Sequence, residues 1–332
     1  MKKITLIVFI FLLILAINSV GIYYMKLLSR NKATYGMIDG NVVCTYINTD
    51  SEMFVSGMQM GDKILKIDNI DVINKHFMYN RIIEKTKPGT KLQYTILRDQ
   101  DTLNLQVVME PFYSNFQLWE YVIASILCAL LSAAAMLSFP ASRTMISVYN
   151  IFNLLAVMIV YFHVPFGNPI LYITLIISSY LLLQFLTDFS YLYLIKGKKR
   201  HLFVILNLLS AVATLHWIIR YIIWVIGMTE ELYIPLMNAM KLYQLMAAIT
   251  ILSCSIIIIY KIMKISSSYM PKVYTTTTAF ILIFMLPYPL FYSLPLVFGK
   301  KELIPFDIFF QSYILLLILL LFYKNNIKRI FL

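Results

Sequence analysis

Long apolar segments with few charged residues are the feature of this sequence that most limits its possible folds. The hydrocarbon core of a bilayer requires about 20 consecutive apolar residues for each spanning helix. The qualifying segments are residues 4–28, 118–139, 144–164, 169–194, 202–226, 235–260, 274–297 and 305–323. The pattern predicts an α-helical polytopic membrane protein with about eight transmembrane helices.

The composition supports a membrane environment. Of 332 residues, 60% are hydrophobic and 13% are charged, whereas a soluble domain is about half apolar and about a quarter charged. The formal net charge of +12 would suggest nucleic acid as a partner of a soluble protein. Here the basic residues gather between apolar segments, so membrane topology explains them better. We therefore expect contacts with membrane lipids and no nucleic-acid partner.

The distribution of lysine and arginine predicts the topology. With the N-terminus inside, the residues on the cytoplasmic side are Lys2, Lys3, Arg143, Lys196, Lys198, Lys199, Arg200, Lys261, Lys264, Lys272, Lys324, Lys328 and Arg329. Glu230 and Glu231 then lie outside, and only Lys300 and Lys301 oppose the positive-inside rule. The chain is predicted to be a multi-pass protein of the cell membrane, with both termini in the cytoplasm.

Three domains follow from the same pattern. Residues 1–28 are expected to form an uncleaved anchor helix, because residues 16–19 (Ala-Ile-Asn-Ser) are a poor cleavage site for a signal peptide. A cleaved signal peptide is the alternative. Residues 29–112 have mixed charges and short apolar runs, which predict an extracytoplasmic α+β domain inserted between the first two spans. Residues 113–332 are predicted to form a seven-helix transmembrane domain.

The most informative stretch of the soluble domain begins at Ser56. It reads Ser-Gly-Met-Gln-Met-Gly-Asp-Lys-Ile-Leu-Lys-Ile-Asp-Asn. Gly57 and Gly61 permit a tight bend of the backbone, residues 64–67 suit a short buried strand, and the Asp-Asn pair at residues 68–69 favours a turn. The stretch resembles the central signature of PDZ domains, with a soluble domain that matches by chance as the alternative.

The flanking sequence is similar to a PDZ domain in the same order. The expected elements are a strand at 40–47, a short helix at 50–55, a longer helix at 75–84, a turn at 87–90, and strands at 92–98 and 102–109. PDZ domains bind peptide ends by adding a strand to the edge of a sheet. The resemblance implies a groove with a carboxylate-binding loop near residues 35–37. Its expected residues are Tyr35, Gly36, Met37, Val42, Cys44, His76 and Ile83. A degenerate groove that serves only as a scaffold is the alternative.

Ionisable residues inside the predicted spans are a second group of candidates, because they are costly in lipid. His216 and Arg220 are four residues apart and share one helix face. Lys241 lies near the outer end of the next span. We expect these three residues to line a polar, partly cationic cavity that accepts an anionic group such as a peptide carboxylate. Alternatively, Arg220 and Lys241 extend to the outer headgroups.

The sequence lacks the common catalytic and metal-binding motifs. It contains no His-Glu-x-x-His pair, no Gly-x-x-x-x-Gly-Lys phosphate loop and no Gly-x-Ser-x-Gly nucleophile elbow. Cys44, Cys128 and Cys254 lie far apart, without the spacing of a metal site or a disulfide framework. We expect the cysteines to be packing residues, and we expect no enzyme activity, no catalytic residue, no metal and no cofactor.

The order of an anchor helix, an external PDZ-like domain and seven further spans resembles the sensor portion of ComP-type quorum-sensing histidine kinases. Residues 57–67, the Pro-x-Pro at 287–289, Leu-Pro-Leu at 294–296 and Ile-Pro-Phe at 304–306 carry the likeness. It implies a receptor for an extracellular, pheromone-like peptide in two-component signal transduction. The family's kinase domain is absent from this sequence. Either a separate kinase or output partner supplies the output, or the sequence is part of a longer kinase; a homodimer is plausible by analogy.

Two other functional classes are compatible with the sequence. The first is a scaffold or chaperone whose PDZ domain holds another secreted or membrane protein. The second is a transporter or an accessory to peptide export, which the proline-rich span at residues 274–297 favours slightly, because broken helices are common in transporters.

The cavity hypothesis makes a direct prediction. Replacing Arg220→Ala removes the central cation, so it should abolish the response to a peptide ligand while leaving the amount of protein at the cell surface unchanged. A dose–response measurement in cells, with surface labelling as the control, tests this. An unchanged dose response would disprove the cavity.

Overall fold

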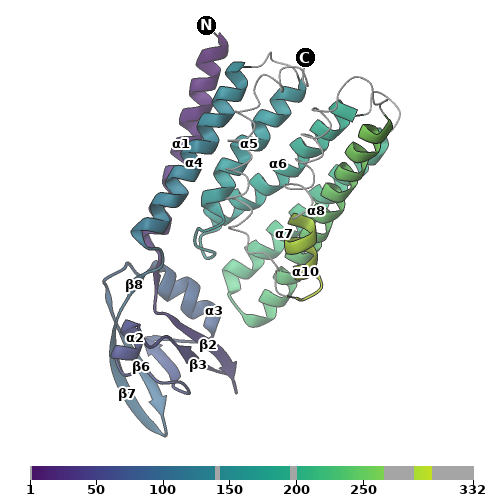
Figure 1. Cartoon of the computed structure of the whole chain (residues 1–332). Helices are drawn as coiled ribbons and strands as arrows, with labels where there is room; N and C mark the ends of the chain where they lie inside the picture. The colour runs from purple at the N-terminus through teal and green to yellow at the C-terminus, as the bar shows by residue number, and fades with distance from the viewer. Residues whose placement is uncertain (1, 139–142, 195–199, 265–287, 301–332) are drawn as a thin grey trace.

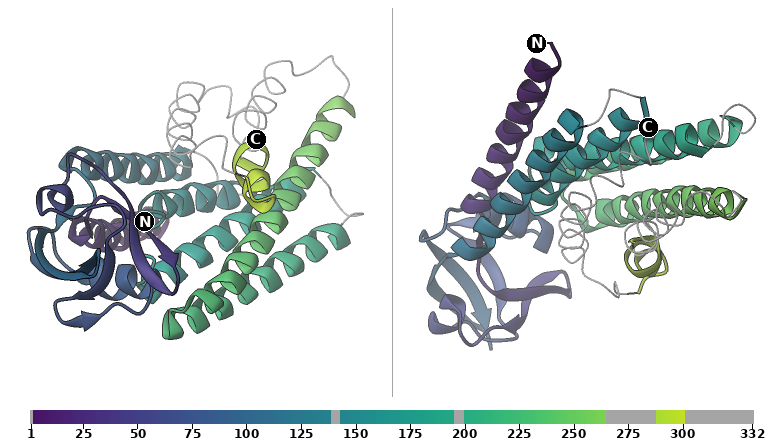
Figure 2. Two further views of the ribbon diagram at one scale, coloured as in Figure 1. Left: turned by 90° about the horizontal axis from the view of Figure 1, so that it is seen from below. Right: turned by 45° about the horizontal axis from the view of Figure 1, so that its top comes forward.

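The computed structural model of this protein describes residues 2–138, 143–194, 200–264 and 288–300. It has two parts, a bundle of long helices and a β-rich domain at one end of the bundle (Figure 1). Seen from below, the β-rich domain lies mostly to one side, next to α1 (Lys2–Leu27) and α4 (Asn115–Ser138) (Figure 2). The chain enters the domain from α1 and leaves it into α4.

The bundle consists of long apolar helices at the places that the hydropathy pattern predicts. After α1 and α4 they are α5 (Arg143–Tyr161), α6 (Pro169–Leu194), α7 (Arg200–Gly227) and α8 (Glu230–Lys264), followed by the short η4 (Tyr288–Ser293) and α10 (Leu294–Val297). By length and composition, α1, α6, α7 and α8 are each able to cross a membrane. The predicted span 305–323 and most of 274–297 lie outside the described residues, so the count of eight spans stays a prediction.

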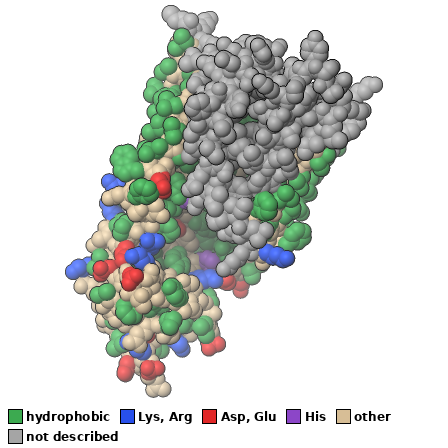
Figure 3. Space-filling model, in the orientation of Figure 1, with side chains coloured by type: hydrophobic (Ala, Val, Ile, Leu, Met, Phe, Trp, Pro, Cys, Tyr) green, Lys and Arg blue, Asp and Glu red, His purple; other side chains and the backbone are tan. Residues whose placement is uncertain are grey.

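Polar side chains inside the bundle pair across helices, as apolar surroundings favour. Asn18 of α1 donates to the Ser125 hydroxyl of α4 and to the Ala156 carbonyl of α5. The Tyr161 hydroxyl donates to the Ile17 carbonyl at 3.0 Å. These bonds fasten α1 to its neighbours, while the outward face of α1 presents apolar side chains (Figure 3).

The β-rich domain is built around one antiparallel sheet. Its strands, in spatial order, are β2 (Ala33–Ile38), β3 (Asn41–Ile47), β4 (Lys63–Ile67), β6 (Lys91–Arg98) and β7 (Asp101–Val108), with β5 (Ile70–Asp71) paired to β4. A separate pair, β1 (Ser29–Arg30) and β8 (Glu110–Pro111), closes the base of the domain.

Two helical segments complete the domain. They are α2 (Glu52–Val55) and a continuous segment made of α3 (Lys75–Phe77), η1 (Met78–Ile82) and η2 (Ile83–Lys85), which we call the 75–85 helix. Leu92, Tyr94 and Ile96 alternate along β6 and are all buried, as the two-residue period of a strand with one covered face requires. Met78 and Ile83 of the 75–85 helix pack in the same core.

Most of the predicted elements of this domain are confirmed. The strand at 40–47 is observed as β3, the short helix at 50–55 as α2, and the strands at 92–98 and 102–109 as β6 and β7. The longer helix at 75–84 is also observed. Its middle, η1, has the wider π-type hydrogen bonding and its end, η2, the tighter 3-10 type, which the sequence pattern did not indicate.

Residues 35–37 belong to strand β2, so the predicted loop at this position was wrong. Asp39 and Gly40 have φ angles of +49° and +76° and form a two-residue turn between β2 and β3. An Asp-Gly pair with both residues at positive φ is a strong hairpin signal. The hairpin places β2 at one edge of the sheet.

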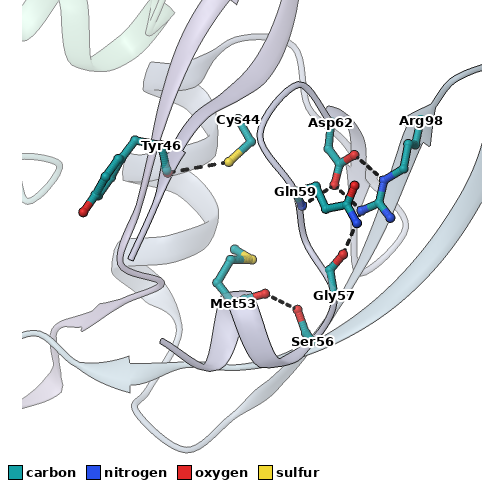
Figure 4. Close-up of polar contacts among 8 residues, drawn as sticks. All are labelled: Cys44, Tyr46, Met53, Ser56, Gly57, Gln59, Asp62 and Arg98. Atoms are coloured by element: carbon teal, nitrogen blue, oxygen red, sulfur yellow. Dashed lines mark hydrogen bonds and ion pairs between the residues drawn. The ribbon is translucent and has the colours of Figure 1, made fainter. Parts of the chain in front are cut away.

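The glycine-rich signature forms a tight loop that is closed by a buried carboxylate. Gly57 and Gly61 have φ angles of +90° and +96°, which favour glycine. Asp62 is 1% exposed, and its carboxylate accepts the Gln59 N–H and two bonds from Arg98, all at 2.7 Å (Figure 4). Arg98 also donates to the Gly57 carbonyl at 2.7 Å. The loop is thereby joined to β6.

Asp62 should be a main determinant of the stability of this domain. Asp62→Ala leaves Arg98 without its carboxylate and the Gln59 N–H without an acceptor, so we expect a loss of about 3 kcal/mol in the free energy of unfolding. Hydrogen exchange of residues 40–110 in denaturant measures it. Asp50→Ala removes an exposed carboxylate of the same domain and should cost less than about 0.5 kcal/mol. Equal losses in the two variants would contradict the assignment.

Candidate peptide-binding edge

Strand β2 offers backbone groups that no strand among the described residues uses. It pairs with β3 on one side and is the first strand in the sheet. The Ile38–Asn41 pair closes a two-residue turn and is therefore hydrogen-bonded, and alternation makes Gly36–Val43 the next such pair. Tyr35 must then direct its N–H and C=O away from β3. Met37 does the same, so β2 presents a free edge to an added strand.

The 75–85 helix runs beside this edge and contacts it through Tyr79. The Tyr79 hydroxyl donates to the Ala33 carbonyl of β2 at 3.2 Å. The rings of Tyr35 and Tyr79 meet edge to face, with centroids 5.8 Å apart. Asn31 holds the other end of Tyr35 by donating to its hydroxyl at 2.7 Å. The hydroxyl of Tyr79 therefore occupies a backbone acceptor of β2 that an added strand could otherwise approach.

The structure separates the predicted groove residues into two groups. Tyr35, Gly36 and Met37 all lie on β2 and form the candidate edge. Val42 and Cys44 must be corrected, because β3 lies between β2 and β4 and has no free edge. Both side chains are buried in the core. Burial also raises the pKa of the Cys44 thiol to about 11, which fits the packing role predicted for this cysteine.

His76 points away from the edge and towards the membrane helices. Its Nε2 lies 2.8 Å from a carboxylate oxygen of Glu230 at the start of α8. Its ring stacks on Tyr233 with centroids 4.2 Å apart and meets the edge of Trp224 at 5.9 Å. Burial lowers the pKa of His76, although Glu230 acts in the opposite direction. Ile83, also predicted for the groove, is buried in the core of the domain.

Two further contacts join the 75–85 helix to the bundle. Glu84 accepts the Gly167 N–H at 3.0 Å, in the loop between α5 and α6. Arg81 donates to the Val225 carbonyl near the end of α7 at 3.3 Å. Burial raises the pKa of Glu84 from 4.5 to about 7, and its bonds to backbone N–H groups only partly oppose this. One of the groups that dock the domain on the helices, Glu84, therefore changes charge near neutral pH.

The three predicted intramembrane residues are each partly exposed. His216 and Arg220 lie on α7, and Lys241 lies on α8. Within the described part of the chain, no hydrogen bond or ion pair joins them, and no group of three metal-binding side chains could hold a metal ion. The cavity stays a prediction.

Sequence reasoning missed Tyr79, Glu84 and Gly167. Nothing local marks them, because each acts through a residue far away in the sequence. A weak signal existed at Glu84, whose carboxylate follows the apolar pair at residues 82–83 and is placed for burial. Gly167 stands between two prolines in a short loop, where a glycine often marks a close approach. A Cβ at this position would lie 2.7 Å from Glu84.

Comparison with known proteins identifies the domain that carries this edge. Residues 30–109 match the family model of the PDZ domain. These residues are a PDZ domain. The serine endoprotease DegS of Haemophilus influenzae is 40% identical over 74 residues, which are 22% of this chain and 22% of that protein. A solved structure entitled "HtrA-type protease AlgWS227A with decapeptide" is 18% identical and covers 27% of this chain and 30% of that chain, with a TM-score of 0.25.

These relatives share only a part of this chain. The chain spans less than a third of the length of each relative. The homology concerns the PDZ domain, which is the non-catalytic part of such proteases.

The Glu84 contact should make docking of the PDZ domain depend on pH. Because the pKa of Glu84 is raised, the docked state favours the protonated carboxyl group. The contribution of Glu84 to the stability of the docked state is therefore complete below pH 4.5 and is lost as the pH rises through about 7. We expect the protection of residues 75–85 against hydrogen exchange, corrected for intrinsic rates, to fall about tenfold between pH 6 and pH 8. Glu84→Gln, which imitates the protonated form, should remove the change.

A matched control isolates this effect. Glu52→Gln removes an exposed carboxylate of the same domain and should leave the pH profile as in the wild type. His76 acts in the opposite sense, because its pKa is lowered and protonation in acid weakens docking; the comparison therefore begins at pH 6. A Glu84→Gln variant that keeps the full pH dependence would contradict the assignment.

Proposed function

We propose that this protein is a membrane receptor module that binds an extracellular peptide along β2 and performs no catalysis of its own. The free edge of β2 is the observation that carries the proposal, because Tyr35 and Met37 direct backbone groups outward beside the 75–85 helix. PDZ domains bind an extended peptide as an added strand at such an edge. Main-chain bonds then supply affinity, and the neighbouring side chains supply specificity.

The distribution of charge supports a PDZ domain outside the cell. The domain contacts Glu230 at the start of α8, whereas Lys261 and Lys264 lie at the other end of that helix. The domain also contacts the end of α7, whose opposite end begins at Arg200. Basic ends of spanning helices face the cytoplasm. The proposed topology is therefore an extracytoplasmic PDZ domain with cytoplasmic N- and C-termini.

A pheromone-like peptide is the ligand that we favour. The order of anchor helix, PDZ domain and further spans resembles ComP-type sensors, and this likeness motivates a role in quorum sensing and two-component signalling. In that role the output comes from a separate kinase or from a longer form of the chain, with a homodimer as the plausible assembly. The membrane helices that the PDZ domain contacts are the natural receivers of the signal.

A scaffold or chaperone for another secreted or membrane protein is the second candidate. The domain exposes large apolar side chains at Phe54, Val55 and Met60, with exposed fractions of 51%, 76% and 69%. Apolar side chains that gather on a surface often mark contact with a protein. The homology to PDZ domains of proteases fits a protein partner as well as a short peptide.

Peptide binding should depend on the backbone N–H of Met37. In Met37→Pro this N–H is absent and the proline ring faces the incoming strand, so the peptide loses a hydrogen bond. The domain itself should still fold, because an edge strand tolerates proline where the N–H faces outward. The full chain in lipid nanodiscs is first used to select binders from random octapeptides with a free carboxyl end. Binding of the selected peptides to Met37→Pro should be weaker by about tenfold or more.

Met37→Ala is the matched control, because it shortens the side chain but keeps the N–H. It should retain affinity to within about threefold. Equal binding by Met37→Pro and the wild type, or no enrichment of any peptide, would contradict the receptor proposal. Enrichment only with folded secreted proteins would favour the scaffold.

A further inference from the structure

The 75–85 helix has two functional faces. One face contacts the free edge, through the Tyr79 hydroxyl on the Ala33 carbonyl and the Tyr79 ring on Tyr35. The other face contacts the membrane helices. No described loop separates the two faces, since α3, η1 and η2 follow one another directly. A displacement at one face must therefore reach the other.

The docking face contacts three separate parts of the bundle. Lys75 and His76 approach Glu230 at the start of α8, at 3.3 and 2.8 Å. Arg81 reaches the end of α7, and Glu84 reaches the loop before α6. One continuous segment thus touches the end of α7, the start of α8 and the loop before α6.

The loop before α6 leaves no free space for movement of the helix towards it. A Cβ placed on Gly167 would lie 2.7 Å from Glu84 and 2.9 Å from Asn80. Real Cβ atoms do not approach other atoms so closely, so the backbone of the loop and the 75–85 helix are in direct contact. Any tilt of the helix in this direction has to displace the loop.

The middle of the helix departs from regular geometry. Residues 78–82 form a π-type turn that contains Arg81 and lies between the contacts at His76 and Glu84. Such turns are uncommon and occur often at functional sites. Tyr79, which contacts the edge, lies within this turn. The irregular turn is therefore the part of the helix that both faces share.

A continuous set of aromatic rings leads from the docking face into the bundle. His76 meets Trp224, and Trp224 lies 6.2 Å from Tyr221 between ring centroids. Tyr221 stacks on Tyr172 of α6 at 4.5 Å. Trp217 continues the contact, at 6.0 Å from Tyr172 and 5.0 Å from Tyr243 of α8. Closely packed rings of this kind transmit displacement because they leave few voids.

We propose that the 75–85 helix couples occupancy of the β2 edge to the arrangement of α6, α7 and α8. An added strand competes with the Tyr79 hydroxyl for the outward side of β2 and shifts the π-type turn. The shift changes the contacts of His76, Arg81 and Glu84 with the three helices. This proposal extends the proposed function, since the event that it transmits is binding at the edge. Coupling of this kind acts equally in both directions.

Reciprocity allows a test without any peptide. The full chain in lipid nanodiscs is analysed by hydrogen exchange. Gly167→Ala disturbs the docking face from the membrane side, and we expect exchange of residues 33–38 to rise about fivefold or more. Tyr79→Phe frees the edge side, and we expect a comparable rise at residues 164–170. The double variant should show less than the sum of the two effects, because both act on one element.

Matched controls accompany each variant. Phe116→Ala shortens a side chain that is 73% exposed at the start of α4, where none of the docking contacts described above lies. Tyr46→Phe removes a hydroxyl from an exposed tyrosine on β3. Neither control should alter exchange at the distant segment.

The outcomes separate coupling from simple damage. If Gly167→Ala raises exchange throughout the sheet, including β6 and β7, the domain has unfolded and Arg81→Ala is used instead, with Lys85→Ala as its control. Changes confined to the mutated face, or purely additive effects in the double variant, would overturn the proposal. Since no peptide is present, a failure here is distinct from a failure of peptide binding in the Met37→Pro experiment.

Discussion

Backbone N–H and C=O groups need hydrogen-bond partners, and this requirement governs both parts of the molecule. In the bundle, the long helices satisfy these groups internally, as lipid surroundings demand. In the PDZ domain, the sheet ladder satisfies them everywhere that a strand has neighbours on both sides. The outward groups of β2 have no neighbouring strand among the described residues; at Ala33 the carbonyl accepts from the Tyr79 hydroxyl and the N–H donates to the Asn31 side chain. The outward N–H and C=O groups of Tyr35 and Met37 on β2 are therefore available to an added strand.

The same helix that borders this open edge also fastens the domain to the bundle. The contacts of His76, Arg81 and Glu84 are polar and lie at the ends of α7 and α8 and in the loop before α6. Such contacts are weaker than a packed apolar interface and are suited to being broken and remade. The apolar core under β6 holds the domain itself together and is separate from the docking contacts. Stability of the domain and attachment of the domain are therefore governed by different residues.

The sequence predicted the parts of the structure that depend on local patterns. Gly57, Gly61 and the short apolar strand at residues 64–67 predicted the PDZ domain, and runs of apolar residues predicted the helices of the bundle. Residues 35–37 of β2 were predicted as a loop from the resemblance to PDZ domains, whereas the Asp-Gly pair at residues 39–40 is a hairpin signal that fits a strand before it. Contacts such as Glu84 with Gly167 depend on how two distant segments pack, which no local pattern encodes. The orientation of His76 towards the bundle was missed for the same reason.

The pairing of β1 with β8 brings the two ends of the PDZ domain together, and the Phe112 N–H donates to the Leu28 carbonyl at 2.9 Å. The chain therefore leaves the bundle and returns to it at nearly one point. A domain inserted in this way can be exchanged for another without moving α1 or α4, because the distance to be bridged stays the same. Evolution could alter ligand preference by replacing the whole PDZ domain between β1 and β8 as a unit. The replacement domain would need a strand pair like β1 and β8 that holds its two ends together, and a helix that contacts Glu230 and Gly167.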